Sequence, residues 1–144
     1  MSNRQDKVKN CMMVLVCLAT SMVLIGCGIE NRSSTMASKQ FLSMSLNPQA
    51  EYQPLLTGEP QTCGMRSGRV YLKLGEECGH HSTEEHEEML TFISGQGTAF
   101  IGENEAAHEV GKDSIIYIPP HVPHNIKNTG TEPLIYIYCV APVK

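Results

Sequence analysis

The residues best suited to chemistry are histidines and glutamates gathered in two short stretches of the chain. All six histidines lie between residues 80 and 124, and five of them fall in residues 79–88 and 119–125. The first stretch also carries a run of glutamates. Imidazole nitrogens and carboxylate oxygens together suit divalent first-row transition metal ions. The two stretches therefore predict a metal site, against the alternative of a solvated acidic loop with surface histidines.

Strand geometry limits which of these side chains can meet. Residues two apart on a strand point to the same side, so His86 and Glu88 can face one cavity together. His121 and His124 lie on an expected turn and strand start that can face the same cavity. Tyrosines elsewhere in the chain are expected in the core or the barrel lining, and no catalytic residue is assigned.

Short strands separated by turns must position the two stretches. The expected strands cover residues 70–74, 88–93, 98–101, 106–110, 114–118, 125–128 and 134–140. The run Ser-Gly-Gln-Gly at residues 94–97 predicts a hairpin turn. The chain has no Trp and only three Phe, so its core must come from aliphatic residues, Met and Tyr, which suits strands. Many short strands at even spacing predict an all-β sandwich, jelly roll or barrel.

The spacing of the two stretches resembles the two sequence motifs of the cupin superfamily. In the first motif, the residues that fall at the expected spacings are Gly75, His81, Glu88 and Gly95. In the second motif they are Pro119, His124 and Asn128. The resemblance covers roughly residues 68–142 and implies a single small jelly-roll β-barrel of the cupin-2 type.

The sequence departs from the motifs at positions that matter for metal binding. Thr83 stands where the family has its second histidine, and His121 stands where the second motif has a glycine. The family's usual ligands are three His and one Glu, of which the chain keeps, by position, His81, Glu88 and His124. A fourth ligand could come from His86, which we favour, or from His121. The resemblance implies a divalent transition metal, with iron, manganese, zinc, nickel, copper and cobalt all open.

The N-terminal residues have the pattern of a bacterial export signal. Residues 1–10 are polar and basic, and residues 11–27 carry no charge. Residues 24–27, Leu-Ile-Gly-Cys, resemble the bacterial lipobox, which implies cleavage before Cys27 and lipid attachment to its thiol. Acyl chains on Cys27 would anchor the protein to a membrane outside the cytoplasm, in the periplasm or at the cell surface. The alternative is an uncleaved membrane anchor.

The expected organisation is a signal peptide at 1–26, a lipidated tether and N-terminal extension at 27–59, and the barrel at 60–144. Residues 28–38 are rich in Ser, Asn and Thr and predict a flexible tether. Apolar side chains between residues 41 and 46 predict a short strand or helix that packs on the barrel or on a partner barrel.

Charge and resemblance together limit the function. The net charge is −4 and no basic stripe is visible, so nucleic acid is not an expected partner. The resemblance implies a metal-dependent dioxygenase, isomerase or lyase that acts on a small polar molecule. Two alternatives stay open: a binding module for a small molecule or metal at the cell surface, and a structural barrel with a vestigial pocket. The resemblance also implies a homodimer formed through sheet contacts.

Overall fold

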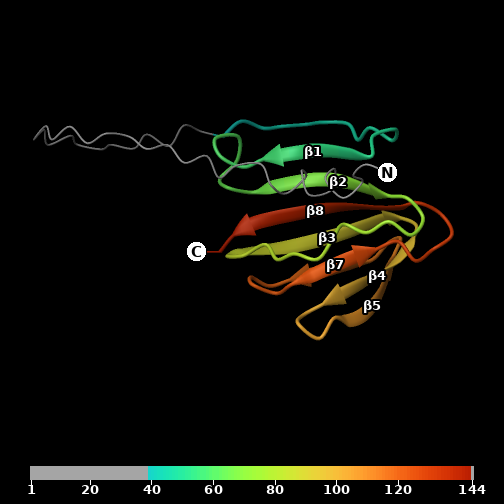
Figure 1. Cartoon of the computed structure of the whole chain (residues 1–144). Helices are drawn as coiled ribbons and strands as arrows, with labels where there is room; N and C mark the ends of the chain where they lie inside the picture. Colours follow the sequence, from blue (N-terminus) through green and yellow to red (C-terminus); the bar gives the residue numbers. More distant parts are fainter. Residues whose placement is uncertain (1–38, 144) are drawn as a thin grey trace, which may run out of the picture. The chain divides into compact units, whose positions relative to one another are not determined.

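Eight β-strands make up the part of the chain that the computed structural model describes, residues 39–143 (Figure 1). They are β1 (Tyr52–Thr57), β2 (Arg66–Leu72), β3 (His86–Ser94), β4 (Gln96–Ile101), β5 (Ala106–Gly111), β6 (Ile115–Ile118), β7 (His124–Lys127) and β8 (Leu134–Pro142). Residues 39–143 contain no helix, and therefore none long and apolar enough to cross a membrane. The expectation of an all-β fold is confirmed.

The strands form two antiparallel sheets that face each other. The larger sheet has the order β1-β2-β8-β3-β6 and the smaller one the order β5-β4-β7. Figure 1 shows β8, the last strand of the chain, lying between β2 and β3 in the larger sheet. One hydrophobic core takes buried side chains from both sheets: Leu72, Leu90, Phe92, Ile118, Leu134 and Tyr136 from the larger, and Ala99, Val110 and Ile126 from the smaller. The sheets therefore enclose a shared interior.

Alternation along β3 points one polar residue into that interior. Leu90 and Phe92 are each 1% exposed, whereas Met89 and Ile93, on either side of the pair, face outward. Burying a Leu or Phe side chain contributes roughly 1.5–3 kcal/mol, so this register is strongly favoured. Glu88 lies on the same face of β3 as Leu90, and the register carries its carboxylate inward.

The turn between β3 and β4 requires a glycine. Gly95 has a φ of +79°, and a Cβ there would lie 2.3 Å from the carbonyl oxygen of Pro133. Only glycine fits both the left-handed backbone and this close approach. A turn is therefore present at the predicted place, but it is not the predicted hairpin, because β3 pairs with β6 and β8 whereas β4 pairs with β5 and β7 in the other sheet.

The larger sheet begins ahead of residue 60, where the sequence analysis placed the start of the barrel. Strand β1 pairs with β2 from Tyr52 onward, with a register shift between Pro54 and Leu56. Proline lacks an amide hydrogen and is tolerated on an edge strand such as β1. The compact unit that contains the sheets starts at Lys39, so the extension from residue 39 is part of it. The expected signal peptide, Cys27 and the tether to residue 38 lie outside the described residues.

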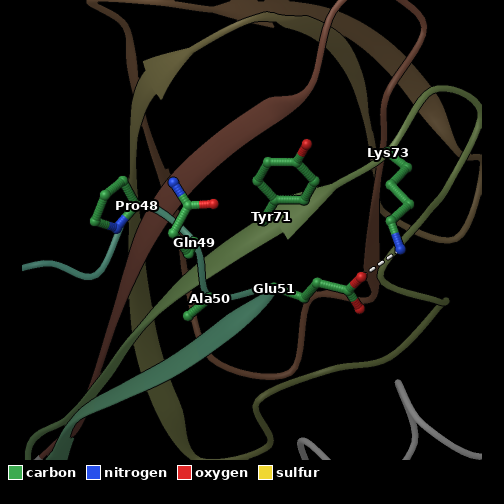
Figure 2. Close-up of a pocket in the computed structure, with 6 residues that line it drawn as sticks. All are labelled: Pro48, Gln49, Ala50, Glu51, Tyr71 and Lys73. Atoms are coloured by element: carbon green, nitrogen blue, oxygen red, sulfur yellow. Dashed lines mark hydrogen bonds and ion pairs between the residues drawn. The ribbon is translucent and has the colours of Figure 1, made fainter.

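The segment from residue 39 to 50 covers the outer face of β2 without forming a helix or strand. Ser67 and Arg69 point away from the core, yet each is only 3% exposed. Arg69 donates from Nη1 to the carbonyl oxygen of Ala50 over 2.6 Å. Figure 2 shows the end of this segment beside β2, where the ion pair between Glu51 and Lys73 closes a shallow hollow.

Candidate metal centre

Three of the predicted ligand residues meet in the barrel interior. His81 comes from the loop between β2 and β3, Glu88 from the inner face of β3, and His124 from the first position of β7. Each offers one ligand atom, and these atoms all lie within 4.8 Å of one another. Glu88 and His124 are buried and His81 is half-buried.

The two histidines are joined through their backbones as well. The amide of His81 donates to the carbonyl oxygen of His124 over 3.0 Å, and the amide of His124 donates back over 2.7 Å. Their rings meet edge to face, with centroids 4.4 Å apart and an angle of 61° between the planes. This bridge, together with one between Glu77 and Lys127, brings the loop before β3 against β7.

Backbone carbonyl groups fix the tautomer of both rings. Nδ1 of His81 lies 2.7 Å from the carbonyl oxygen of Gly79, and Nδ1 of His124 lies 3.0 Å from that of Val122. Since a carbonyl oxygen can only accept, the proton of each neutral ring is assigned to Nδ1. The Nε2 lone pairs are then left for another partner, which is the usual arrangement of metal-binding histidines.

The carboxylate of Glu88 lacks the hydrogen bonds that a buried charge needs. Its Oε2 lies 3.1 Å from Nε2 of His124, but it accepts no hydrogen bond of acceptable geometry from residues 39–143. A buried carboxylate that faces a neutral imidazole without a hydrogen bond is costly. A cation between this oxygen and the two Nε2 lone pairs would remove the cost, so the donor set fits a divalent transition metal.

The surroundings shift the pKa values of the two histidines in opposite directions. Burial lowers the pKa of His81 below its usual value, against the raising effect of the Gly79 carbonyl group. Burial also lowers the pKa of His124, but the Glu88 carboxylate and the Val122 carbonyl group outweigh it, and the net pKa is raised. Protons therefore compete with a metal ion chiefly at His124.

Thr83 and His86 interact with each other rather than with this cluster. Oγ1 of Thr83 donates to the carbonyl oxygen of His86 over 2.8 Å, and the amide of His86 donates to the carbonyl oxygen of Thr83 over 3.1 Å. Nδ1 of the His86 ring lies 3.2 Å from the same Thr83 oxygen. His86, the fourth ligand that we favoured, is not part of the group that the structure brings together.

His121 also lies outside the group and occupies an unusual backbone conformation. It is exposed and has a φ of +62°, in the left-handed region that favours glycine. Its amide donates to the carbonyl oxygen of Glu84 over 2.7 Å, and Glu84 has a φ of +54°. The glycine that the motif places at His121 would adopt this conformation without strain.

Sequence reasoning gave no role to Asn125 and considered Cys78 only as a disulfide partner of Cys63 or a minor alternative ligand, whereas both residues contact the segments that carry the site, and Cys78 is a free thiol. Oδ1 of Asn125 accepts the amide hydrogen of Gly79 over 3.0 Å and so holds the loop that orients His81. The Sγ atom of Cys78 accepts from the amide of Ile126, and burial raises the pKa of this thiol to about 11. Asn and Cys residues near strands have many structural roles, so the sequence alone does not show that these two lie next to the site.

Comparison with known proteins matches this barrel to one family. The family model described as a cupin domain, Cupin_2, matches residues 68–140. The match spans both stretches of histidines and glutamates, and it includes all three members of the cluster.

Individual relatives agree with the fold. Over 62 residues the chain is 39% identical to MJ1618 of Methanocaldococcus jannaschii, an uncharacterized protein, covering 43% of this chain and 48% of that protein. The chain thus spans about half the length of this curated relative. The crystal structure of BH2720 from Bacillus halodurans is similar, with a TM-score of 0.58, 26% identity and coverage of 66% of this chain and 72% of that one. The cupin protein BF4112 from Bacteroides fragilis has a TM-score of 0.60, 22% identity and coverage of 73% and 86%.

Proposed function

The chain belongs to the Cupin_2 family of cupin domains, and we propose that its barrel holds one divalent transition metal ion on His81, Glu88 and His124. The ion would be bound by Nε2 of each histidine and by the Glu88 carboxylate. The site would take up a small polar molecule, and the protein would work outside the cytoplasm. The observation that carries this proposal is the buried Glu88 oxygen without an adequate hydrogen bond, facing two histidines whose Nε2 atoms are unprotonated when neutral.

The roles of the chain's own residues follow from their contacts. The carbonyl groups of Gly79 and Val122 hold the two rings in the metal-binding tautomer, and Asn125 holds Gly79. Glu88 supplies the one negative charge of the donor set. A bound ion would supply Lewis acidity or a centre for oxygen chemistry, which are the functions that suit a dioxygenase, isomerase or lyase.

A non-catalytic binding module stays the second candidate, because the family's second histidine is replaced by Thr83, whose side chain forms a hydrogen bond within its own loop. Its hydroxyl group donates to the backbone of His86. The two candidates differ in turnover, since a binding module would return its ligand unchanged while an enzyme would not.

Metal analysis of the purified full chain in detergent tests the proposal. We expect close to one equivalent of a transition metal by elemental analysis after loading with iron, manganese or zinc and removal of excess metal. His124→Ala should lose it, whereas His108→Ala, which removes an exposed histidine on β5, should keep it. No bound metal in the parent protein with any of these ions would rule out the function proposed here.

A lipid anchor on Cys27 is proposed from the sequence alone, because this residue lies outside the described part of the chain. The protein should partition with membranes after expression in a bacterium, and its mature N-terminal peptide should carry the mass of diacylglycerol on Cys27. Cys27→Ser should abolish both. An unmodified Cys27 in the mature protein would refute the anchor.

Self-association is proposed through the outer face of β3 and β6. Met89, Ile115 and Tyr117 are 41%, 66% and 62% exposed on this face. Neighbouring exposed apolar side chains of this kind often mark interfaces, and a symmetric pair would cover the same patch on both copies. Light scattering should give a dimer that Tyr117→Glu dissociates and that His108→Glu, on β5, leaves intact. A monomeric parent protein would contradict this proposal.

A further inference from the structure

We infer that one extra residue in the chain ahead of β3, a β-bulge at Gly79 and His80, makes His81 rather than His80 face the candidate metal centre. Asn125, on β7, is the positioning residue that holds this bulge. The inference rests on the proposed metal site and deepens it, since it explains how the chain selects between two adjacent histidines with the same chemistry.

Residues 77–81 run antiparallel along β7, with a regular register at their start. Glu77 forms a bridge with Lys127. At the next residue, the amide of Cys78 donates to the carbonyl oxygen of Ile126 over 3.0 Å. One step forward along the segment thus matches one step back along β7, as in a regular antiparallel pair.

The register changes by one residue before His81. Continued unchanged, it would place His80 opposite His124, but His81 forms that bridge instead. Between Cys78 and His81 the segment takes three steps, while β7 takes only two steps between their partners. One extra residue of this kind is a β-bulge, which bends a strand and re-aims its side chains.

The extra residue determines which histidine points inward. Residues directly opposite each other on antiparallel strands point to the same face of the sheet. His124 is 1% exposed, and the ring of its partner His81 lies against its own ring. The side chain of His80 is 47% exposed, and its Nε2 lies 3.9 Å from a carboxylate oxygen of Glu105. Without the bulge, the two adjacent histidines would exchange faces.

Gly79 supplies the backbone conformation that the bulge needs. Its φ is +90°, in the region that favours glycine, while a Cβ at this position would meet no atom within 4 Å. Backbone conformation rather than lack of space therefore favours glycine here. A glycine with positive φ is the first residue of one common class of bulge.

Asn125 faces the bulge, and its side chain takes the place of a backbone partner. Its Oδ1 accepts the amide hydrogen of Gly79 over 3.0 Å, and its Nδ2 donates to Oε2 of Glu77 over 3.1 Å. The extra residue of a bulge is left without a partner in the ladder, so the side chain of Asn125 satisfies an amide that the backbone of β7 does not. Asn125 thus acts on the site through the bulge.

Deletion of His80 tests the register. The deletion leaves two steps on each side between Cys78 and His81, so His81 should stay opposite His124 in a regular ladder. We expect the full chain without His80 to bind about one equivalent of cobalt, and His81→Ala to lower its cobalt affinity at least about tenfold, as in the parent protein. Loss of cobalt from the folded deletion variant, or binding that does not depend on His81, would overturn the inference.

Asn125 should matter only while the bulge is present. Asn125→Ala should lower cobalt affinity about tenfold in the parent protein, measured by competition with a chelator, and less than about twofold in the chain without His80. Asn47→Ala removes an exposed asparagine ahead of β1 and should change neither affinity. Equal losses from Asn125→Ala in both chains would refute its role at the bulge.

Hydrogen exchange provides a second measurement that needs neither metal nor the deletion. In the metal-free parent protein, Asn125→Ala removes the acceptor of the Gly79 amide, which should then exchange at least about tenfold faster. The amide of Cys78, bonded to the backbone of β7, serves as the internal control and should change little. Unchanged exchange at Gly79 would contradict the role of Asn125, whether or not the deletion variant folds.

Backbone contacts in metal-free protein separate this inference from the proposed function. Nuclear Overhauser effects between the backbones of His81 and His124 should be present in the parent protein and in the chain without His80. If both chains show these contacts but neither binds cobalt, the proposed metal site fails while the bulge still selects the inward histidine. If the parent protein binds cobalt but the deletion variant loses the contacts, the inference about the bulge fails alone.

Discussion

The backbones of His81 and His124 exchange two hydrogen bonds, of 3.0 and 2.7 Å, directly beside the rings that would bind a metal. The two residues therefore join the loop before β3 to β7 and offer ligand atoms at the same place. The ring positions depend on backbone contacts that need no metal ion. The site should accordingly be assembled before metal binds.

Hydrogen exchange should detect this preassembly. In metal-free protein we expect the amides of His81 and His124 to be protected to a degree similar to the amides of β3, because both are hydrogen-bonded between chain segments. Metal should add little further protection. The measurement is amide exchange followed by NMR, with and without metal. Rapid exchange of both amides in the metal-free protein would show that the loops form the bridge only after metal binds.

Glu88→Gln should stabilise the metal-free protein while it weakens metal binding. A glutamine amide can donate to Nε2 of His124, where the carboxylate and the neutral ring offer two acceptors to each other. We expect a gain of about 1–2 kcal/mol in the free energy of unfolding at alkaline pH, by chemical denaturation with a chelator present. Metal affinity should fall at least about tenfold.

The gain from Glu88→Gln should shrink at acid pH. The pKa of His124 is raised partly by the Glu88 carboxylate, so this attraction stabilises the parent protein fully below the unfolded pKa of about 6.5 and is lost as pH rises through the folded pKa. Glu87 is the residue before Glu88 on β3 and points outward, so Glu87→Gln should change neither the free energy of unfolding at alkaline pH nor the metal affinity. A lower stability of Glu88→Gln at alkaline pH would contradict this account of the site.

Metal affinity should depend on pH through His124. Its raised pKa means that the metal-free protein holds a proton there at pH values where a free histidine is neutral, and metal binding must release that proton. Below that pKa the affinity should fall by up to about tenfold per pH unit. His81, with its lowered pKa, should contribute only at more acid pH. Calorimetric titration in buffers of different ionisation enthalpy measures the protons released, and release of none near pH 6.5 would refute the assignment.

Asn128, the last residue of the second motif, should matter for stability rather than for metal binding. It is 1% exposed, and its Nδ2 donates to the carbonyl oxygens of Leu72 and Glu132 over 3.0 and 2.9 Å. Its Oδ1 accepts from the amide of Gly130. Asn128→Ala should lower the free energy of unfolding by about 2–4 kcal/mol and leave metal stoichiometry unchanged below the melting temperature. The exposed Asn104→Ala serves as the control, and equal stability of the two variants would contradict the prediction.

Cys78 should resist alkylation. A pKa of about 11 leaves about one thiol in a thousand ionised at pH 8, against roughly a quarter for an ordinary cysteine. Cys63 is exposed and should react first with iodoacetamide, as mass spectrometry of the labelled peptides would show. Labelling of Cys78 as fast as Cys63 in folded protein would contradict the burial of this thiol.

Much of the fold could be predicted because alternation and turn residues are local signals. The strands from β3 to β8 lie close to their expected ranges, β2 begins earlier than expected, at Arg66, and Gly95 marks a turn that only glycine fits. Strand β1 was not expected, because Pro54 and the prolines around it argue against a strand. Its pairing with β2 is a long-range contact at a sheet edge, where a proline costs little.

The site was predictable only in part, for a similar reason. Spacing identifies His81, Glu88 and His124, because each is held by regular strands or by the bridge between them. The inference about His86 assumed that the strand alternation of β3 extends to its first residue. His86 is the first residue of β3, directly after a turn, and its hydrogen bonds with Thr83 decide where the ring lies. The position of the His86 ring depends on which local hydrogen bonds form, and residue types alone do not reveal that.

The position of β1 at the sheet edge has a mechanical consequence. The chain enters the larger sheet through β1, whose backbone pairs with β2 alone among the strands, while β8 and then β3 lie farther across. A pull on the N-terminal side would load the contacts of residues 39–50 and then those of β1, before any contact of β3 or β7. The histidine and glutamate cluster lies on β3, on β7 and on the loop before β3, so tension that enters through the N-terminal side would reach it last.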